Sequence, residues 1–303
     1  ARRMGQHMSE MLNENGAAPD APKPSPLWPW LALSALSGVF YFTSFAGFDV
    51  WPLAFIVFVP HLFAVERAGT TNRRTFLLGL TFGVVTNAGG YYWLVGMLGD
   101  FSGFPWPVCV AIASLLWIYQ GALLGVFSLV WKWLRDRGWP SVVAVPVAFA
   151  AVEWLYPILF HSYFGATMHT VPVAMQVADL GGPILVSAVV AMVSGILDDL
   201  RRARMARQPL PLREVAVGLA IVGAALGYGG YRIHEVETRM ASAPEVRVGM
   251  IQANMELDLK RMDPAEGLTR HLDQSIELEA KEHPDLIVWP ESAYMYFVPE
   301  EQQ

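Results

Sequence analysis

The sequence predicts a multi-span α-helical membrane domain followed by the beginning of an α/β domain. The first observation is composition: 54% of the 303 residues are hydrophobic and 16% are charged, whereas soluble domains carry about 25% charged residues. The second is a series of seven apolar stretches, most of them near the ~20 residues with which a helix crosses a bilayer. The third is a change of pattern after Ala243, where strand-like and helix-like segments alternate.

Residues 1–26 are polar and rich in proline, which is typical of a disordered tail. Residues 27–231 form the predicted membrane domain. Its apolar stretches are residues 27–48, 50–65, 75–99, 106–131, 141–160, 172–197 and 214–231. The second stretch is short and follows the first almost directly, so we expect these two to form a tight helical hairpin.

The distribution of basic residues predicts the orientation of this domain. The amino-terminal tail and every second loop together carry 14 Lys and Arg residues, and the three other loops carry none. Cytoplasmic loops of membrane proteins are enriched in Lys and Arg. We therefore expect a cytoplasmic amino terminus, about seven spans, and a carboxyl-terminal part on the far side of the membrane.

Residues 244–303 predict one strand–helix–strand unit with parallel strands. VRVGMIQ is β-branched and alternating, as in a strand, and LIVW is a short apolar run of the kind found in strands buried on both faces. A helix is expected from Asp263 to His283, with Asp263 as N-cap and Pro264 as first helical residue. Its apolar positions are Leu268, Leu272, Ile276 and Leu278. About 55 residues are too few for an α/β domain, so we expect an incomplete one, truncated after its first βαβ unit.

Glu291 directly follows the second predicted strand. Ligands of α/β sheets bind beyond the carboxyl ends of the strands, so this carboxylate is a candidate catalytic group. Trp289 and Tyr294 flank it and are candidate substrate-binding residues that would partly desolvate it. Such a carboxylate suits a general base, and a thiol is a natural nucleophile for it to activate. The alternative is an ordinary surface or capping carboxylate at a turn.

Several segments resemble one enzyme family. A V-x-x-x-Q-x-N strand and loop, then a helix, then a strand ending in WPES resemble the opening of a nitrilase, or carbon–nitrogen hydrolase, domain. Its place after a multi-span region resembles the apolipoprotein N-acyltransferase family, as do FDVWPLAF, GGYYWLVGML, VEWLYP and ADLGG in the apolar stretches. The resemblance extends from about Leu27 to Phe297 and implies that residues 244–303 begin a nitrilase-like αββα domain.

The resemblance implies an acyltransferase of lipoprotein biosynthesis in the inner membrane of a diderm bacterium, with the nitrilase-like domain in the periplasm. Such enzymes transfer an acyl chain from a phospholipid to the amino terminus of a diacylglyceryl-cysteine lipoprotein through a Cys thioester. Glu291 matches their general base, and they need no metal or diffusible cofactor. Their Lys and Cys lie downstream of this Glu, past Gln303, so we expect the present chain alone to be inactive.

Other polar residues leave alternatives open. Lys260, in the loop after the first strand, could line the mouth of the site or be a solvated loop charge. Glu153 lies within the fifth apolar stretch, where acids are often functional, but a structural hydrogen bond to Asn87 or Gln120 explains it equally well. Cys109, the single cysteine, lies in an apolar stretch and is expected to be packed and inert.

Other classes of function receive less support. No metal site is predicted, because His161 and His169 share one loop without a third ligand nearby. No basic run suggests nucleic-acid binding. The rival interpretation is a non-enzymatic membrane scaffold or transporter with a degenerate outer domain. The scarcity of charges within the apolar stretches argues against an ion-coupled transporter.

Overall fold

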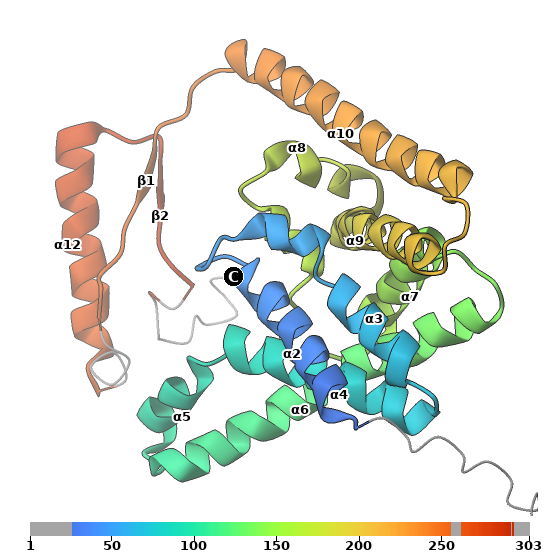
Figure 1. Ribbon diagram of the computed structural model, residues 1–303. Helices are drawn as coiled ribbons and strands as arrows, with labels where there is room; N and C mark the ends of the chain where they lie inside the picture. Colours follow the sequence, from blue (N-terminus) through green and yellow to red (C-terminus); the bar gives the residue numbers. More distant parts are fainter. Residues whose placement is uncertain (1–25, 256–261, 292, 294–303) are drawn as a thin grey trace, which may run out of the picture. The chain divides into compact units, whose positions relative to one another are not determined.

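The computed structural model describes residues 26–255, 262–291 and 293 (Figure 1). Its contacts divide the chain into two units, the first ending at Glu235 and the second beginning at Val236. The helices that begin in the first unit are α2 (Trp28–Thr43), α3 (Val59–Ala68), α4 (Asn72–Gly90), α5 (Leu94–Ser102), α6 (Trp106–Asp136), α7 (Ser141–Leu155), α8 (Pro172–Met175), α9 (Ala178–Met205) and α10 (Leu212–Ala241). Two 3-10 helices join them, η1 (Trp51–Phe55) and η2 (Phe164–Met168).

Four helical segments in the described part of the chain are long and apolar enough to cross a membrane. They are Trp51–Ala68, Trp106–Asp136, Ala178–Met205 and Leu212–Ala241. The other predicted stretches are also helical, but α2 has 16 residues and α7 has 15. A membrane protein with helical spans is therefore supported, whereas the count of seven stays a prediction. The first two stretches do pack together, through α2 and α3.

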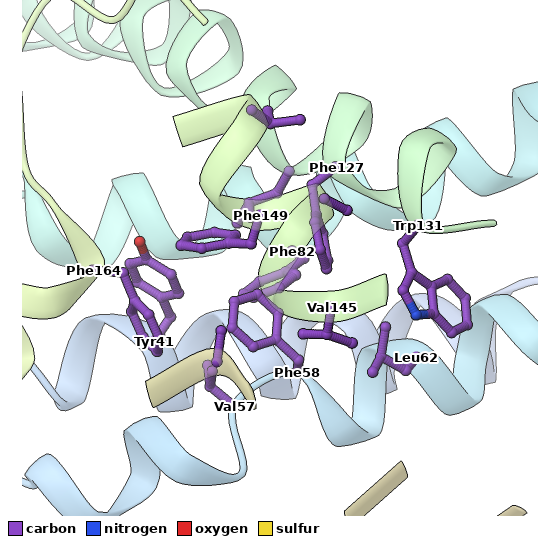
Figure 2. Close-up of a cluster of buried hydrophobic side chains, with 14 of the residues drawn as sticks. Tyr41, Val57, Phe58, Leu62, Phe82, Phe127, Trp131, Val145, Phe149 and Phe164 are labelled. Atoms are coloured by element: carbon purple, nitrogen blue, oxygen red, sulfur yellow. The ribbon is translucent and has the colours of Figure 1, made fainter. Parts of the chain in front are cut away.

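An aromatic cluster forms the centre of the helical unit (Figure 2). Phe58, which precedes α3, lies at the middle of this cluster. Its ring centroid is 5.0 Å from that of Phe149 in α7, 5.2 Å from that of Phe127 in α6 and 5.4 Å from that of Phe164 in η2. Phe82 of α4 adds an edge-on contact at 5.9 Å. Since edge-on and tilted ring pairs are favourable, these contacts join five segments that are distant in sequence.

Helices α4 and α6 approach each other closely enough to require glycine. A Cβ atom on Gly83 would lie 2.0 Å from the carbonyl oxygen of Gly121, and one on Gly121 would lie 2.7 Å from the carbonyl carbon of Gly83. Small residues at such contacts are typical of helix pairs in membranes, where close backbone packing supplies much of the association energy.

The second unit contains β1 (Val248–Met250), α12 (Pro264–Glu282) and β2 (Leu286–Val288). The strands are parallel, with Val248 opposite Leu286 and Met250 opposite Val288, which confirms the predicted βαβ unit. The predicted helix start is also confirmed, because the Asp263 side chain accepts a hydrogen bond from the N–H of Glu266 at 3.1 Å. Such an N-cap satisfies a backbone donor that the helix leaves free.

The expectation that the second strand is buried on both faces is wrong for the residues described here. Leu286 and Val288 are 53% and 43% exposed. Gly249 faces α12, because a Cβ atom there would lie 2.4 Å from a methyl carbon of Leu278. Neighbouring residues of a strand point to opposite faces, so Leu286 and Val288 lie on the face away from α12.

The predicted buried face of α12 is also wrong in part. Leu272 and Ile276 are 45% and 68% exposed. The buried residues of this helix are instead Gly267 and His271. These small and polar residues recur at helical spacing and lie near Met255 and Trp289, in the segments that follow the two strands, which a search for apolar positions does not detect.

Candidate functional site

A cavity of about 630 Å³ lies where the carboxyl ends of β1 and β2 meet. Its walls are the last residue of the first strand and the segment after it, together residues 250–255, the end of the second strand with Trp289 and Pro290, and His271 from α12. In parallel sheets this edge is where ligands bind. The second unit therefore offers a concave site at the place where the sequence predicts one.

Glu291 lies in the turn that follows β2, where the N–H of Ala293 donates to the carbonyl oxygen of Pro290 at 3.0 Å. It directly follows a residue of the cavity wall. Its side chain is exposed, so the residues described here do not supply the desolvation that the sequence suggests. Glu291 is placed next to the cavity, and its catalytic role stays a prediction.

Trp289 is fixed in the cavity wall by α12. Its indole Nε1 donates a hydrogen bond to Ser275 Oγ at 2.9 Å, and its ring centroid lies 5.4 Å from that of His271. One hydrogen bond and one ring contact, both to α12, set the orientation of this large side chain. The other candidates, Lys260 and Tyr294, lie outside the described residues.

His271 is a residue of this site that sequence reasoning missed. It is 2% exposed, and its Nδ1 lies 2.7 Å from the carbonyl oxygen of Gly267. A carbonyl oxygen only accepts, so Nδ1 carries the proton of this hydrogen bond. Nε2 is buried and has no hydrogen-bond partner in the part of the chain that the structure describes. The available signal was the spacing of Gly267, His271 and Ser275 along one helical face.

Glu153 of α7 is buried, and its Oε1 accepts a hydrogen bond from the backbone N–H of Phe164 at 2.7 Å. The partners suggested by the sequence are wrong. Asn87 and Gln120 bond each other at 3.0 Å, and Gln120 also accepts from the N–H of Phe160 at 2.8 Å. Glu153 therefore holds η2 against α7, and the two amides join α4, α6 and the loop before η2.

The remaining sequence candidates have ordinary partners. Cys109 is buried, as predicted, and its thiol lies 3.5 Å from the carbonyl oxygen of Phe104. His169 contacts Asp49 at 3.0 Å across two loops. Within the described ranges, no group of three or more His, Cys, Asp and Glu side chains is arranged to hold a metal ion.

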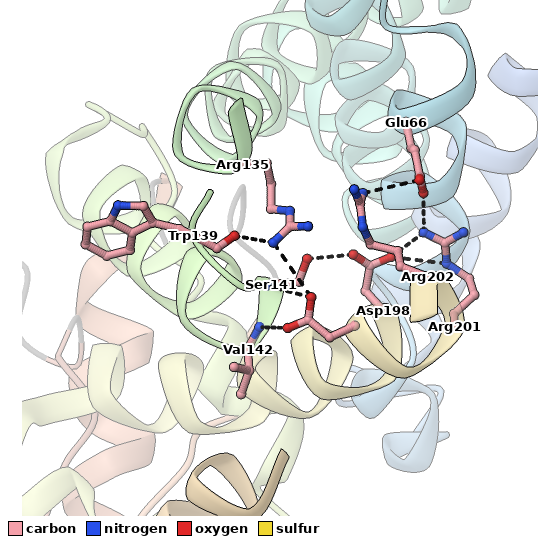
Figure 3. A network of polar contacts seen from close by, with 9 residues as sticks. Glu66, Arg135, Trp139, Ser141, Val142, Asp198, Arg201 and Arg202 are labelled. Carbon is pink, nitrogen blue, oxygen red and sulfur yellow. Dashed lines mark hydrogen bonds and ion pairs between the residues drawn. The ribbon is translucent and has the colours of Figure 1, made fainter. Parts of the chain in front are cut away.

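Several charged side chains meet where α6 and α9 end and α7 begins (Figure 3). Asp199 of α9 accepts hydrogen bonds from the N–H groups of Ser141 and Val142, both at 2.9 Å. Arg135 of α6 lies 3.7 Å from the same carboxylate. Because Pro140 at the N-cap position has no capping side chain, Asp199 supplies the cap of α7 from another helix.

The end of α3 joins this cluster through Glu66, and a second carboxylate of α9, Asp198, takes part as well (Figure 3). Asp198 is fully buried and accepts from Ser141 Oγ and from Arg201, both at 2.6 Å. Arg201 also bonds Glu66 of α3 at 2.5 Å, and Arg202 lies 3.4 Å from Glu66. The segments that carry the basic loops therefore meet on one side of the helical unit.

Loops that carry no Lys or Arg contact one another at other helix ends. His169 pairs with Asp49, and the hydroxyl of Tyr91 donates to Ser162 Oγ at 3.0 Å. The first contact joins the loop that contains Asp49 to the loop that contains Ser162 and His169. The second contact brings the end of α4 to that same loop. The grouping of basic and non-basic loops matches the alternation seen in the sequence.

Comparison with known proteins identifies the family to which this chain is similar. The model of the apolipoprotein N-acyltransferase N-terminal domain matches residues 37–196. A Geobacter metallireducens protein named apolipoprotein N-acyltransferase is 28% identical over 278 residues, covering 89% of this chain and 52% of the relative. A Pseudomonas putida protein of the same name is 30% identical over 286 residues, covering 88% and 52%. The chain spans about half the length of the curated relatives it matches.

Proposed function

The chain belongs to the apolipoprotein N-acyltransferase family, whose N-terminal domain it contains at residues 37–196, and from this premise we propose that it is the membrane-embedded amino-terminal part of such an enzyme. The family match carries the proposal. The curated relatives align beyond the helical unit, since the Geobacter protein matches 89% of the chain. The helical unit and the βαβ unit are therefore parts of one enzyme.

In the proposed reaction, a cysteine thiol attacks the ester carbonyl of a phospholipid. A thioester forms, and the lysophospholipid leaves with the proton of the thiol. The amino group of a diacylglyceryl-cysteine lipoprotein then attacks the thioester, an amide forms, and a proton of the amine returns to the sulfur. Both steps need a group that carries a proton between the nucleophile and the leaving atom, which is the work of a general base.

We assign this proton transfer to Glu291. Its support is its place after β2, beside the cavity at the carboxyl ends of the two strands. Trp289 supports the same site as a fixed wall residue, and Lys260 and Tyr294 remain candidate binding residues. The family resemblance implies a nucleophilic Cys and an oxyanion-stabilising Lys downstream of Glu291, and Cys109, which is buried in the helical unit, is not proposed as the nucleophile. The hydrogen bond from the N–H of Phe164 to Glu153 supports the interpretation that Glu153 has a structural role.

We further propose that the helical unit crosses the inner membrane seven times, with the basic loops in the cytoplasm and the βαβ unit in the periplasm. The support is the clustering of Arg135, Arg201 and Arg202 with the ends of α3 and α7. Separate contacts join the loops that lack basic residues. An excess of Lys and Arg marks the cytoplasmic side.

Cysteine labelling tests this topology cleanly, because the single cysteine is buried. With a membrane-impermeant maleimide on intact spheroplasts, His161→Cys should react, and Arg204→Cys should react only after permeabilisation. The parent chain with Cys109 should stay unlabelled in both conditions. Labelling of Arg204→Cys in intact spheroplasts would show that the orientation is reversed.

The activity is tested in the full-length product of the gene that encodes this chain. We expect the purified enzyme to transfer an acyl chain from phospholipid to a diacylglyceryl lipopeptide, and Glu291→Gln to form no thioester. The matched control is Glu279→Gln, which changes an exposed acid of α12 and should leave turnover unchanged. An acyl-enzyme in Glu291→Gln would remove Glu291 from the base role. A wild-type enzyme without any transfer would favour the scaffold interpretation.

A further inference from the structure

Ser275 of α12 holds the indole of Trp289 through a hydrogen bond that the proposed reaction does not use. The indole Nε1 donates to Ser275 Oγ at 2.9 Å. The hydroxyl of Ser275 donates in turn to the carbonyl oxygen of His271 at 2.6 Å. Because its single proton is used there, the oxygen of Ser275 is left to accept from the indole, which only donates. Ser275 is therefore matched to Trp289 in both position and hydrogen-bonding capacity.

His271 supports the same indole from one turn earlier in α12. Its ring centroid lies 5.4 Å from that of Trp289, and the two ring planes are inclined by 44°. The His271 side chain is 2% exposed, and its Nδ1 donates to the carbonyl oxygen of Gly267 at 2.7 Å. This bond and this burial fix the orientation of the imidazole. The indole of Trp289 therefore packs against a fixed ring while it is bound to a fixed hydroxyl.

The chain that leads from Trp289 to Glu291 is short and stiff. Pro290 joins them, and its ring fixes its own φ angle and restricts the backbone of the residue before it. The N–H of Ala293 then closes a turn onto the carbonyl oxygen of Pro290 at 3.0 Å. The Glu291 side chain is exposed, so its place beside the cavity depends on the backbone that carries it. Trp289 anchors that backbone to α12.

We propose that Ser275 is a positioning residue of the site at the strand ends. Its hydroxyl holds the Trp289 indole and thereby sets, through the link at Pro290, where the Glu291 carboxylate lies beside the cavity. Ser275 acts through Trp289, which lines the cavity, and takes no part in the bond changes. This role rests on the proposed acyl transfer, because it concerns the group that carries the proton in that reaction.

Loss of the Ser275 hydroxyl should slow the chemistry and leave substrate binding intact. In Ser275→Ala the indole loses its acceptor, the Trp289 side chain can turn, and the Glu291 carboxylate spends less time in the productive position. Misplacing a catalytic group by about 1 Å can cost about 10²-fold in rate. We therefore expect the kcat of acyl transfer and the single-turnover rate of thioester formation to fall roughly tenfold to a hundredfold. The KM for phospholipid should stay nearly unchanged.

These rates are measured with the full-length product of the gene, using phospholipid and a diacylglyceryl lipopeptide. Ser275→Thr keeps a hydroxyl at the same place and should retain most of the parent rate. The matched control Gln274→Ala shortens the adjacent exposed side chain of α12 and should react as the parent does. All variants should keep the same helical circular dichroism spectrum, because alanine is a good helix former.

A double-mutant cycle separates the hydrogen bond from a general effect of Ser275 on the fold. Trp289→Phe removes the N–H donor and keeps an aromatic ring. If Ser275 acts through that donor, Ser275→Ala should slow the reaction no further in the Trp289→Phe background. A further loss as large as the loss in the parent would show that Ser275 does not act through the indole.

Three other results would also overturn the positioning role. A Ser275→Ala enzyme as fast as Gln274→Ala would show that the bond does not place Glu291. Equal losses in Ser275→Ala and Ser275→Thr would exclude the hydroxyl, and a raised KM with unchanged kcat would leave Trp289 a binding wall only. In each case the parent enzyme still transfers the acyl chain, so the proposed function stands. A parent enzyme without any transfer would instead refute the proposed function and the role of Ser275 with it.

Discussion

Replacing Asp199 by Ala should destabilise the helical unit, because this carboxylate has two roles. It accepts from the first two N–H groups of α7, each at 2.9 Å. Loss of a helix cap costs about 0.5–2 kcal/mol. It also faces Arg135 at 3.7 Å, and removing one partner of a buried pair costs about 3–5 kcal/mol. Arg135 keeps a bond to the carbonyl oxygen of Trp139 and part of its solvent contact, so we expect a total of about 2–4 kcal/mol.

The free energy of unfolding is measured by titrating the purified chain with sodium dodecyl sulfate and following its helical circular dichroism. Asp199→Asn keeps one acceptor without the charge and should lose less than Asp199→Ala. The control Asp136→Ala removes an exposed acid of an i,i+4 pair and should change stability by less than about 0.5 kcal/mol. If Asp199→Ala behaves like Asp136→Ala, Asp199 is not the cap of α7.

Three further substitutions test the packing of the helical unit by the same titration. Gly83→Ala puts a Cβ atom 2.0 Å from the backbone of α6 and should cost about 1–3 kcal/mol of stability. The control Gly96→Ala, with nothing within 4 Å, should be neutral or slightly stabilising, and equal effects of the two variants would exclude a close contact between α4 and α6. His61 Nε2 lies 2.8 Å from Ser128 Oγ, so a double-mutant cycle of His61→Leu and Ser128→Ala should give a coupling of about 0.6–1.7 kcal/mol, and additive effects would contradict the bond. Glu153→Gln keeps an acceptor for the N–H group of η2 and should cost less stability than Glu153→Leu. The leucine leaves that donor unpaired, which costs about 1–3 kcal/mol, and equal losses in the two variants would show that the carboxylate has another role.

Local signals in the sequence predict the elements of the second unit well. Asp263 and Pro264 are a cap and a first helical residue whose effect does not depend on the rest of the fold, and α12 begins where they predict. The parallel pairing of β1 and β2 follows from chain connectivity. The sequence predicts Leu268, Leu272, Ile276 and Leu278 as the apolar positions of α12. Leu278 does lie against Gly249 of β1, but Leu272 and Ile276 are exposed. Gly267 and His271 are buried instead, against Met255 and Trp289. Which face of a helix is buried depends on its neighbours, and a small residue can lie at a contact as well as a leucine can.

Hydropathy predicts the helices of the first unit but not the partners of their polar groups. Ordinary side-chain pairing suggests Asn87 or Gln120 for Glu153, yet the acid bonds the backbone of η2 and the two amides bond each other. An apolar environment requires that every buried polar group finds a partner, but it does not specify which one. A backbone N–H at the start of a short 3-10 helix is a donor as good as any amide, and it leaves no mark in composition. The sequence therefore indicates where polar contacts must form, while the packing of the helices decides which groups make them.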